Sequence, residues 1–257
     1  MNLLLFTYTL DKHHPILSHQ LALVNNISPY FEKVIVITGK VGTYQVSSNV
    51  LVVDSNWAGN HKIKSVLRFL FYFCREIFHS RNLVIYSHMT TLQSLIVAPI
   101  TFLMRIPHYL WYAHTSKPIA LRFVYPLIEG ILTSTSGSCP FESRKVHRIG
   151  QGIDSELFKV EISDNVDFHN LVHFGRIDQS KGLLEIIELV KLKRSEIHPY
   201  TLTLIGNPAR NESHSYFNKL INLSRNQGYR EWLTIEPAIP RDELASRLKN
   251  FQVFIHN

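Results

Sequence analysis

The stretch LVHFGRIDQSKGLLEIIELV, residues 171–190, decides the fold class of this protein. Its first six residues form a short apolar and aromatic run of the kind that favours a β-strand. From residue 181 onward the apolar positions recur on one face of a helix: Leu183, Ile186, Ile187 and Val190. A strand that passes directly into a helix is the repeating unit of α/β folds with a parallel sheet.

The same alternation extends from this unit toward both ends of the chain. On the N-terminal side we predict strands at residues 2–7, 33–38, 49–53, 82–88, 108–114, 130–134 and 145–150. Helices are predicted between them at residues 16–24, 64–78 and 91–104. On the C-terminal side, strands are predicted at 201–206, 233–238 and 251–257, and helices at 181–194, about 213–227 and 241–249.

A polar segment, DNVDFHN at residues 164–170, interrupts the alternation once. We therefore expect two doubly wound, Rossmann-like α/β domains, residues 1–163 and 164–257. The second domain is short, and its last predicted strand has no following helix to cover it. A parallel strand is normally covered on both faces, so we expect this second domain to be incomplete.

Composition restricts the kind of protein and its partners. The chain has 257 residues, of which 45% are hydrophobic, so a disordered protein is excluded. With 27 Lys and Arg against 20 Asp and Glu, the net charge of +7 favours an anionic partner. The basic residues are dispersed and match no nucleic-acid-binding pattern, so nucleic acid is not expected. The two cysteines, Cys74 and Cys139, form no disulfide framework, and the N-terminus resembles no signal peptide, so we expect a cytoplasmic protein.

The loop between the strand and the helix of residues 171–190 has the composition of an anion site. Gly175 allows close approach of the backbone, while Arg176 and Lys181 bring two positive charges. A helix N-terminus at the carboxyl end of a parallel strand adds unpaired N–H groups. These features together suit a diphosphate. The alternative is an ordinary connection with a solvated arginine and a lysine at the start of the helix.

Four segments in the same order resemble the retaining glycosyltransferases of family 4, which have the two-domain GT-B fold. LVHFGRIDQSKGL resembles the family's "GR…KG" signature, and HRIGQGIDSELF resembles its "NG(V/I)D…F" segment, with Gln151 where Asn is usual. TLTLIGNP resembles the strand that ends in glycine, and AIPRDELASRLKNFQVFIHN the stretch before the nucleotide-sugar motif. The family's E-x-x-x-x-x-x-x-E motif would lie beyond Asn257. The resemblance implies a nucleotide-sugar donor, retention of configuration, and no metal or other cofactor.

The resemblance also assigns site residues by position. It makes Arg176 and Lys181 the groups that hold the donor diphosphate, with Gly175 lining the same site. His114 matches the histidine of the first domain beside the reacting sugar, and Ile239 falls where the nucleotide base lies. From the residues alone, His114 reads as a packed core histidine on the predicted strand 108–114.

The resemblance implies an acceptor that is a glycan or a lipid-linked molecule, in the assembly of cell-surface polysaccharide or lipopolysaccharide. Two other functions are compatible with the pattern: a nucleotide-sugar epimerase of the same fold, and a partial domain pair that binds nucleotide without turnover. The basic, aromatic segment HKIKSVLRFLFYFCREIFHSR, residues 61–81, suits peripheral contact with an anionic membrane at its inner face. Its alternative is a helix that covers the first sheet with its charges in water. The fourteen histidines include no metal-binding motif, so no metal site is expected.

Overall fold

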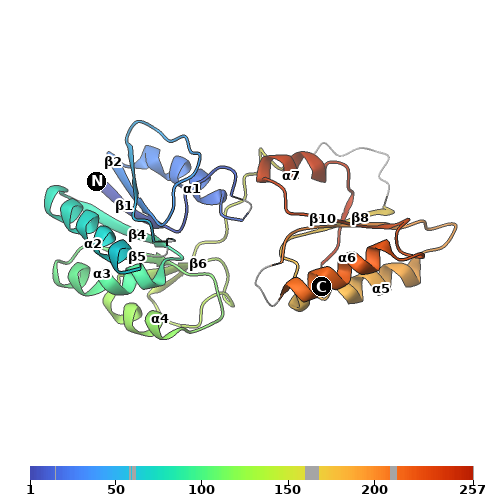
Figure 1. Ribbon diagram of the computed structural model, residues 1–257. Coiled ribbons are helices and arrows are strands. Elements are labelled where there is room, and N and C mark those ends of the chain that lie inside the picture. Colours follow the sequence, from blue (N-terminus) through green and yellow to red (C-terminus); the bar gives the residue numbers. More distant parts are fainter. Residues whose placement is uncertain (15, 58, 60–61, 160–167, 209–212, 257) are drawn as a thin grey trace. The chain divides into compact units, whose positions relative to one another are not determined.

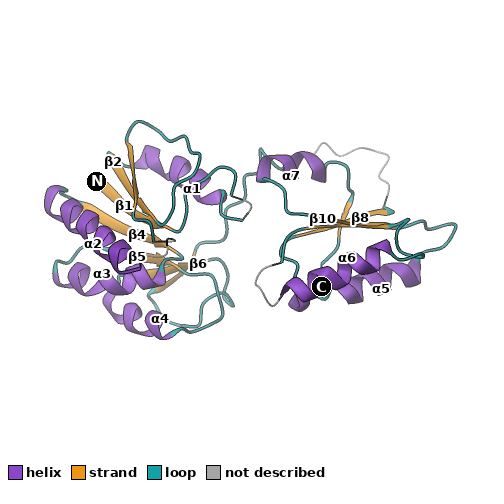
Figure 2. Ribbon diagram, viewed as in Figure 1, coloured by secondary structure: helices purple, strands orange, loops and turns teal. Residues whose placement is uncertain are grey.

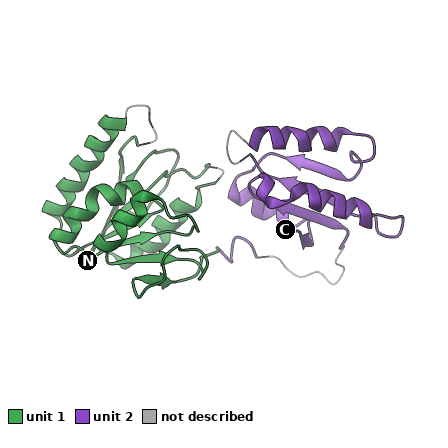
Figure 3. Cartoon of the chain, turned by 90° about the horizontal axis from the view of Figure 1, so that it is seen from below, with its two compact units in different colours: residues 1–153 green, residues 154–257 purple. Residues whose placement is uncertain are grey.

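The computed structural model describes residues 1–257 except 15, 58, 60–61, 160–167, 209–212 and 257. The chain divides into two compact units, Met1–Ile153 and Asp154–Asn257 (Figure 3). The domain boundary predicted between residues 163 and 164 lies outside the described residues. Each unit consists of a parallel sheet between helices (Figure 2), which confirms the predicted α/β class with two Rossmann-like sheets.

The first unit is built on a sheet of seven parallel strands in the order β3-β2-β1-β4-β5-β6-β7. Their bounds are β1 Asn2–Thr7, β2 Lys33–Thr38, β3 Val50–Asp54, β4 Leu83–His88, β5 His108–Trp111, β6 Gly130–Thr133 and β7 Val146–Arg148. The strand order reverses at β1, which pairs with both β2 and β4. In open α/β sheets, ligands bind at the carboxyl ends of the strands where the order reverses.

Helices cover both faces of this sheet because its central strands are apolar on both sides. Leu3 and Leu5 of β1 pack in the cluster of α1 (His19–Ile27), while Leu4 and Phe6 pack against α2 (Lys62–His79) and α3 (Thr91–Leu103). Figure 1 shows α1 on one side of the strands and α2 and α3 on the other. The remaining helical segments are α4 Ile119–Val124, η1 Ser28–Tyr30 and η2 Tyr125–Leu127.

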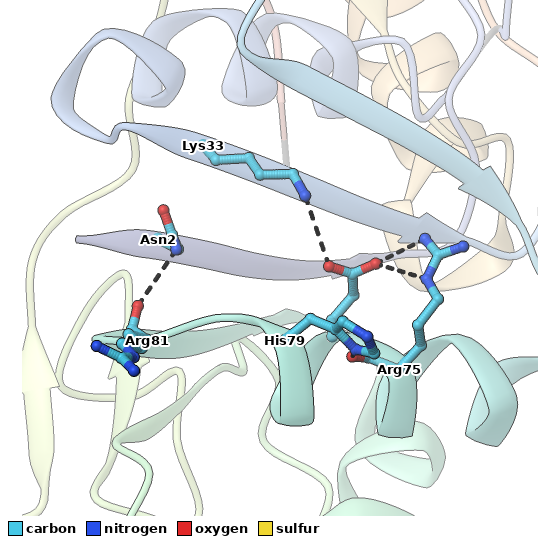
Figure 4. A network of polar contacts seen from close by, with 6 residues as sticks. Asn2, Lys33, Arg75, His79 and Arg81 are labelled. Atoms are coloured by element: carbon cyan, nitrogen blue, oxygen red, sulfur yellow. Dashed lines mark hydrogen bonds and ion pairs between the residues drawn. The ribbon is translucent and has the colours of Figure 1, made fainter.

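The one carboxylate of helix α2, that of Glu76, is buried. Glu76 is 3% exposed, and its Oε1 accepts hydrogen bonds from Nε and Nη2 of Arg75 at 2.9 and 2.6 Å (Figure 4). Nζ of Lys33 lies 3.7 Å from its Oε2. A buried carboxylate is tolerated when it is paired in this way. The exposed charges of α2 are consequently all basic.

The second unit has four parallel strands in the order β10-β9-β8-β11. The bounds are β8 Asn170–Phe174, β9 Thr201–Ile205, β10 Leu233–Glu236 and β11 Val253–Phe254. Helices α5 (Leu183–Lys193) and α6 (Ser213–Arg225) share one apolar cluster with the strands, and α7 (Arg241–Leu248) lies over the opposite face (Figure 1). The predicted strand-helix order of this unit is therefore confirmed.

Several predicted strands are shorter in the structure, among them those predicted over 145–150 and 233–238, which span Val146–Arg148 and Leu233–Glu236. The strand predicted over 108–114 ends at Trp111, because its neighbours stop pairing there: β4 ends opposite Trp111 and turns at Met89, which has φ +59°. The strand predicted over 251–257 pairs with β8 only at Val253 and Phe254. A short helical turn, η3 (Gln179–Lys181), precedes α5 where the sequence predicted one continuous helix.

Candidate functional site

The loops that follow β8, β9 and β10 meet at the carboxyl edge of the second sheet. The N–H of Gly175 donates to the carbonyl of Ile205 at 3.0 Å, and the N–H of Gly206 donates to the carbonyl of Glu236 at 3.0 Å. The parallel pairing thus continues beyond the last strand residues. This edge is where α/β sheets bind their ligands.

Asn207 joins all three loops. Its carbonyl accepts from the N–H of Ile177 at 2.9 Å, and its side-chain Oδ1 accepts from the N–H of Ala238 at 3.0 Å. The sequence alone did not indicate this role, because the two partners of Asn207 lie about thirty positions before and after it in the chain. The structural role of Asn207 is to hold the three loops together.

Gly206 lets the first two of these loops come into contact. A Cβ atom at this position would lie 1.9 Å from the carbonyl oxygen of Gly175, which is far inside van der Waals contact. Gly175 itself has φ +144°, a conformation open to glycine and unfavourable for other residues. The loop after β8 therefore requires glycine at position 175, and the loop after β9 requires glycine at position 206.

The turn into α5 is held by Asp178. Its Oδ1 accepts from the N–H and the hydroxyl of Ser180 at 3.0 and 2.7 Å, and its Oδ2 accepts from the hydroxyl of Ser213 at 2.8 Å. These hydrogen bonds, with a smaller contribution from the charge of Arg176, lower the pKa of Asp178 to about 2. Gly182, at φ +56°, then redirects the chain into α5.

Arg176 and Lys181 lie at the two ends of this turn. The side chain of Arg176 is exposed, and among the residues that the structure describes it forms no salt bridge. Lys181 is half-buried, and its Nζ lies 3.3 Å from Nε2 of His256, just after β11. The turn therefore presents two cations near the start of an eleven-residue helix, whose first N–H groups and dipole favour an anion.

Ile239 lies in the loop after β10, two residues before α7 begins. Its side chain is partly exposed. The preceding residue, Ala238, is the one whose N–H binds Asn207, so Ile239 is tied to the same edge of the sheet as Gly175, Arg176 and Lys181.

His114 belongs to the first unit and is not a core residue. The expectation of a packed histidine on a strand was wrong, since β5 ends at Trp111 and the side chain of His114 is exposed. Its Nδ1 accepts a hydrogen bond from the N–H of Ser116 at 3.0 Å. The neutral ring therefore carries its proton on Nε2, the nitrogen that remains for a ligand. The buried histidine of this strand is His108, which binds Ser87 at 2.8 Å.

A second polar cluster, which sequence analysis missed, lies at the carboxyl edge of the first sheet. Gln20 of α1 contacts Nδ1 of His88 at 3.2 Å and accepts from the N–H of Thr9 at 3.0 Å. The ring of His88 stacks on Trp111 with centroids 6.1 Å apart. Burial, and to a lesser extent repulsion from His19, lowers the pKa of His88 to about 4. His88 is therefore neutral near pH 7.

Within the described residues, no group of three or more His, Cys, Asp or Glu side chains could hold a metal ion. No helix in the described part of the chain is long and apolar enough to span a bilayer.

Neither a protein-family model nor a curated protein sequence matches this chain. Solved structures do match its fold. HepE of Anabaena in complex with UDP-glucose is 15% identical with a TM-score of 0.68, over 99% of this chain and 73% of HepE. The α,α-trehalose 6-phosphate synthase of Burkholderia multivorans is 11% identical with a TM-score of 0.62, over 98% of this chain and 77% of the synthase.

A UDP-GlcNAc 2-epimerase from Methanocaldococcus jannaschii also matches, at 13% identity and a TM-score of 0.55, over 99% of this chain and 78% of the epimerase. At these identities the likeness establishes the fold. The chain has the GT-B architecture that is shared by glycosyltransferases and by this epimerase.

Proposed function

We propose that this protein is a glycosyltransferase that moves a sugar from a nucleotide-sugar to a glycan or lipid-linked acceptor. One observation carries the proposal: the turn of residues 175–182 places Arg176 and Lys181 beside the N-terminus of α5, at the carboxyl edge of a Rossmann-like sheet. The UDP and UDP-glucose complexes of the similarly folded HepE support a nucleotide-sugar as the donor.

The two cations act on the diphosphate in different ways. The guanidinium of Arg176 can bind two phosphate oxygens as a planar fork, whereas the ammonium of Lys181 acts as a point charge. Breaking the bond from the sugar carbon to the phosphate oxygen leaves negative charge on the departing diphosphate. Fixed cations that stabilise this charge more than the charge of the intact donor lower the barrier.

We further propose that transfer proceeds with retention and without a metal ion. The acceptor hydroxyl attacks from the face that the nucleotide leaves, and the departing phosphate takes its proton. Arg176, Lys181 and the N–H groups of α5 supply the positive charge that a metal would otherwise provide. Donor binding should therefore be unchanged by EDTA, and a loss of binding that Mg²⁺ restores would overturn this part of the proposal.

His114 and Ile239 have separate roles in this proposal. The Nε2–H of His114, left available by the bond from Ser116, donates to a hydroxyl of the transferred sugar. Ile239, partly exposed beside Ala238, packs on the nucleotide base. His114→Ala should reduce turnover more than nucleotide binding, while Ile239→Ser should weaken binding of the nucleotide even without its sugar.

Calorimetry with UDP-, GDP- and ADP-sugars tests the proposed donor site. A ligand that binds only the folded state also raises the unfolding temperature, so a thermal-shift screen identifies the base first. Arg176→Ala and Lys181→Ala should each weaken binding roughly tenfold to a hundredfold, the value of a charge-assisted hydrogen bond. Arg230→Ala, an exposed arginine just before β10 at the opposite edge of the sheet, is the matched control. Equal affinities for Arg176→Ala and the wild type would contradict the assignment.

The epimerase of similar fold supports a second candidate reaction on the same donor. The two activities differ in their need for an acceptor. A glycosyltransferase releases nucleotide in step with acceptor glycosylation, whereas an epimerase converts its sugar with no acceptor present. Donor binding with neither reaction would support the third candidate, a domain pair that binds nucleotide without turnover.

The outer face of α2 supports membrane contact as part of this function. Four large apolar side chains of this helix are 61–78% exposed: Ile63, Leu67, Phe71 and Phe78. Exposed basic side chains accompany them, Lys62, Lys64 and Arg68, and the only acid of the helix, Glu76, is buried. An apolar stripe flanked by positive charge fits the surface of an anionic bilayer.

We therefore propose a cytoplasmic enzyme that works at the inner face of the membrane in cell-surface polysaccharide or lipopolysaccharide assembly. The chain should float with vesicles of phosphatidylcholine and phosphatidylglycerol more than with phosphatidylcholine alone. Changing Lys62, Lys64 and Arg68 to Glu should abolish flotation, while the same change at Lys219, Arg225 and Arg230 of the second unit should not. Unchanged flotation of the α2 variant would exclude this surface.

A further inference from the structure

His173 is a buried polar residue that lies next to the loop of residues 175–182. The proposed transfer reaction gives it no role. His173 lies on β8 two residues before Gly175, and its side chain is 1% exposed. Its ring stacks on Phe254 of β11 with centroids 5.9 Å apart, and the ring of His256 lies 5.6 Å away.

One ring nitrogen of His173 has a hydrogen-bond partner, and the other has none among the described residues. Nδ1 lies 3.0 Å from the carbonyl oxygen of Ile255, and since a carbonyl only accepts, Nδ1 carries a proton. Nε2 is buried and has no hydrogen-bond partner among the residues that the structure describes. A buried polar atom left without a partner costs free energy, and such atoms are uncommon in native proteins.

The free nitrogen faces the loop that contains Gly175. A Cβ atom built on Gly175 would lie 3.9 Å from Nε2, so the nitrogen is next to the backbone at the point where the loop leaves β8. The absence of a side chain at Gly175 keeps this approach open. A ligand atom lying against Gly175 would come within reach of Nε2.

Burial and the neighbouring charges lower the pKa of His173 in the free protein. Burial lowers its pKa, the carbonyl of Ile255 raises it, and the positive charges of His256 after β11 and Lys181 of η3 lower it further. From β9, the paired residue Leu204 brings no charge, and Arg176 follows three positions along the chain. A diphosphate at this loop would reverse the balance, because it neutralises the cations and attracts a proton to Nε2.

We propose that His173 is a further phosphate-binding residue of this site, which takes up a proton at Nε2 as the diphosphate of a nucleotide-sugar binds. The inference rests on the proposed function, since it requires a diphosphate at the Gly175–Gly182 loop. With both nitrogens protonated, the ring donates from Nδ1 to Ile255 and from Nε2 to a phosphate oxygen. Binding thereby supplies the partner that Nε2 lacks.

Calorimetry in buffers of different ionisation enthalpy measures this proton directly. UDP-glucose is the first probe, followed by GDP-mannose and ADP-glucose, because both phosphates of these diesters stay ionised near neutral pH and take up no proton themselves. For the wild type we expect the binding enthalpy to vary with the buffer in the sense of proton uptake. His173→Gln should remove that variation and weaken binding about tenfold, the effect of one charged hydrogen bond.

Two control variants separate His173 from the other histidines of the unit. His256→Gln should retain proton uptake, and so should His198→Gln, which lies before β9 at the opposite edge of the sheet. Proton uptake that survives His173→Gln, or that disappears in His256→Gln alone, would overturn the inference.

Nitrogen-15 NMR of the wild type tests the proposal without a variant that could fail to fold. On addition of UDP-glucose, the Nε2 resonance of His173 should move from the position of a bare nitrogen to that of a protonated one. Binding with no change in this resonance would overturn the inference and leave the proposed function intact. No binding of any nucleotide-sugar would overturn both.

Discussion

At the scale of single residues, the site depends on glycines and on one asparagine as much as on its cations. Arg176 and Lys181 could be proposed as site residues from the sequence because their positions in a strand-to-helix loop match a known pattern. Asn207 and His173 could not be, because their roles arise from contacts between loops and strands far apart in the chain. The contacts that define their roles form only when β8, β9 and β11 lie side by side in the folded sheet.

Gly206→Ala tests how closely the loops must approach. The added methyl group would lie 1.9 Å from the carbonyl oxygen of Gly175, so the backbone of one loop has to move. We expect a loss of about 1–3 kcal/mol in the free energy of unfolding, as for overpacked sites, and donor binding weakened more than tenfold. Gly137→Ala is the control, since a Cβ there would have no neighbour within 4 Å. Urea denaturation and calorimetry measure both effects, and an unaffected Gly206→Ala would show that the loops are not in this contact.

The two buried histidines of the first unit predict a loss of stability in mild acid. Burial lowers the pKa of His88 to about 4 and that of His108 to about 3, from an ordinary value of 6.5. Below pH 6.5 the unfolded chain therefore binds protons that the folded chain does not, so stability falls as the pH falls toward 4. The slope for each histidine is at most about 1.4 kcal/mol per pH unit. Urea midpoints measured across this range should fall with pH in the wild type and fall less in His108→Gln; a flat profile would contradict the burial of these rings.

At the scale of elements, apolar periodicity predicted most strands and helices. The errors occur at the ends of elements, where contacts with neighbouring elements determine the last residue. Residues 112–114 have the composition of a strand, yet β5 stops at Trp111 because β4 turns away at Met89. Helix α5 starts later than its amphipathic pattern indicates, since Asp178 and Gly182 form a separate turn first. Such endpoints depend on hydrogen bonds to other elements, which a local pattern does not contain.

The ion pair between Arg75 and Glu76 of α2 predicts a different loss of stability for each of its two partners. Arg75→Met leaves the buried carboxylate of Glu76 with Lys33 as its one cation among the described residues, and the Nζ of Lys33 is 3.7 Å away. We expect a loss of about 2–3 kcal/mol in the free energy of unfolding. Glu76→Gln should cost less, about 1 kcal/mol, because the cations that lose their partner are partly exposed and regain water. Arg68→Met should change stability by less than about 0.5 kcal/mol. Guanidinium denaturation compares the three, and a larger loss for Glu76→Gln than for Arg75→Met would contradict the burial of this charge.

At the scale of the whole molecule, the chain has a two-unit α/β fold that matches glycosyltransferases of 10–15% sequence identity. Such likeness is expected when a fold is specified by the apolar pattern of strands and helices rather than by particular residues. The two Rossmann-like sheets could therefore be predicted from the sequence. The substrates could not, because they depend on a few side chains in the loops at the sheet edges.

A crystal structure of the protein with UDP-glucose, or with whichever nucleotide-sugar the thermal-shift screen selects, tests the central claim most directly. We expect the diphosphate against the loop of residues 175–182, with oxygens about 3 Å from the guanidinium of Arg176 and the ammonium of Lys181. A diphosphate bound elsewhere on the chain, or bound at this loop without contact to either cation, would contradict the proposed donor site.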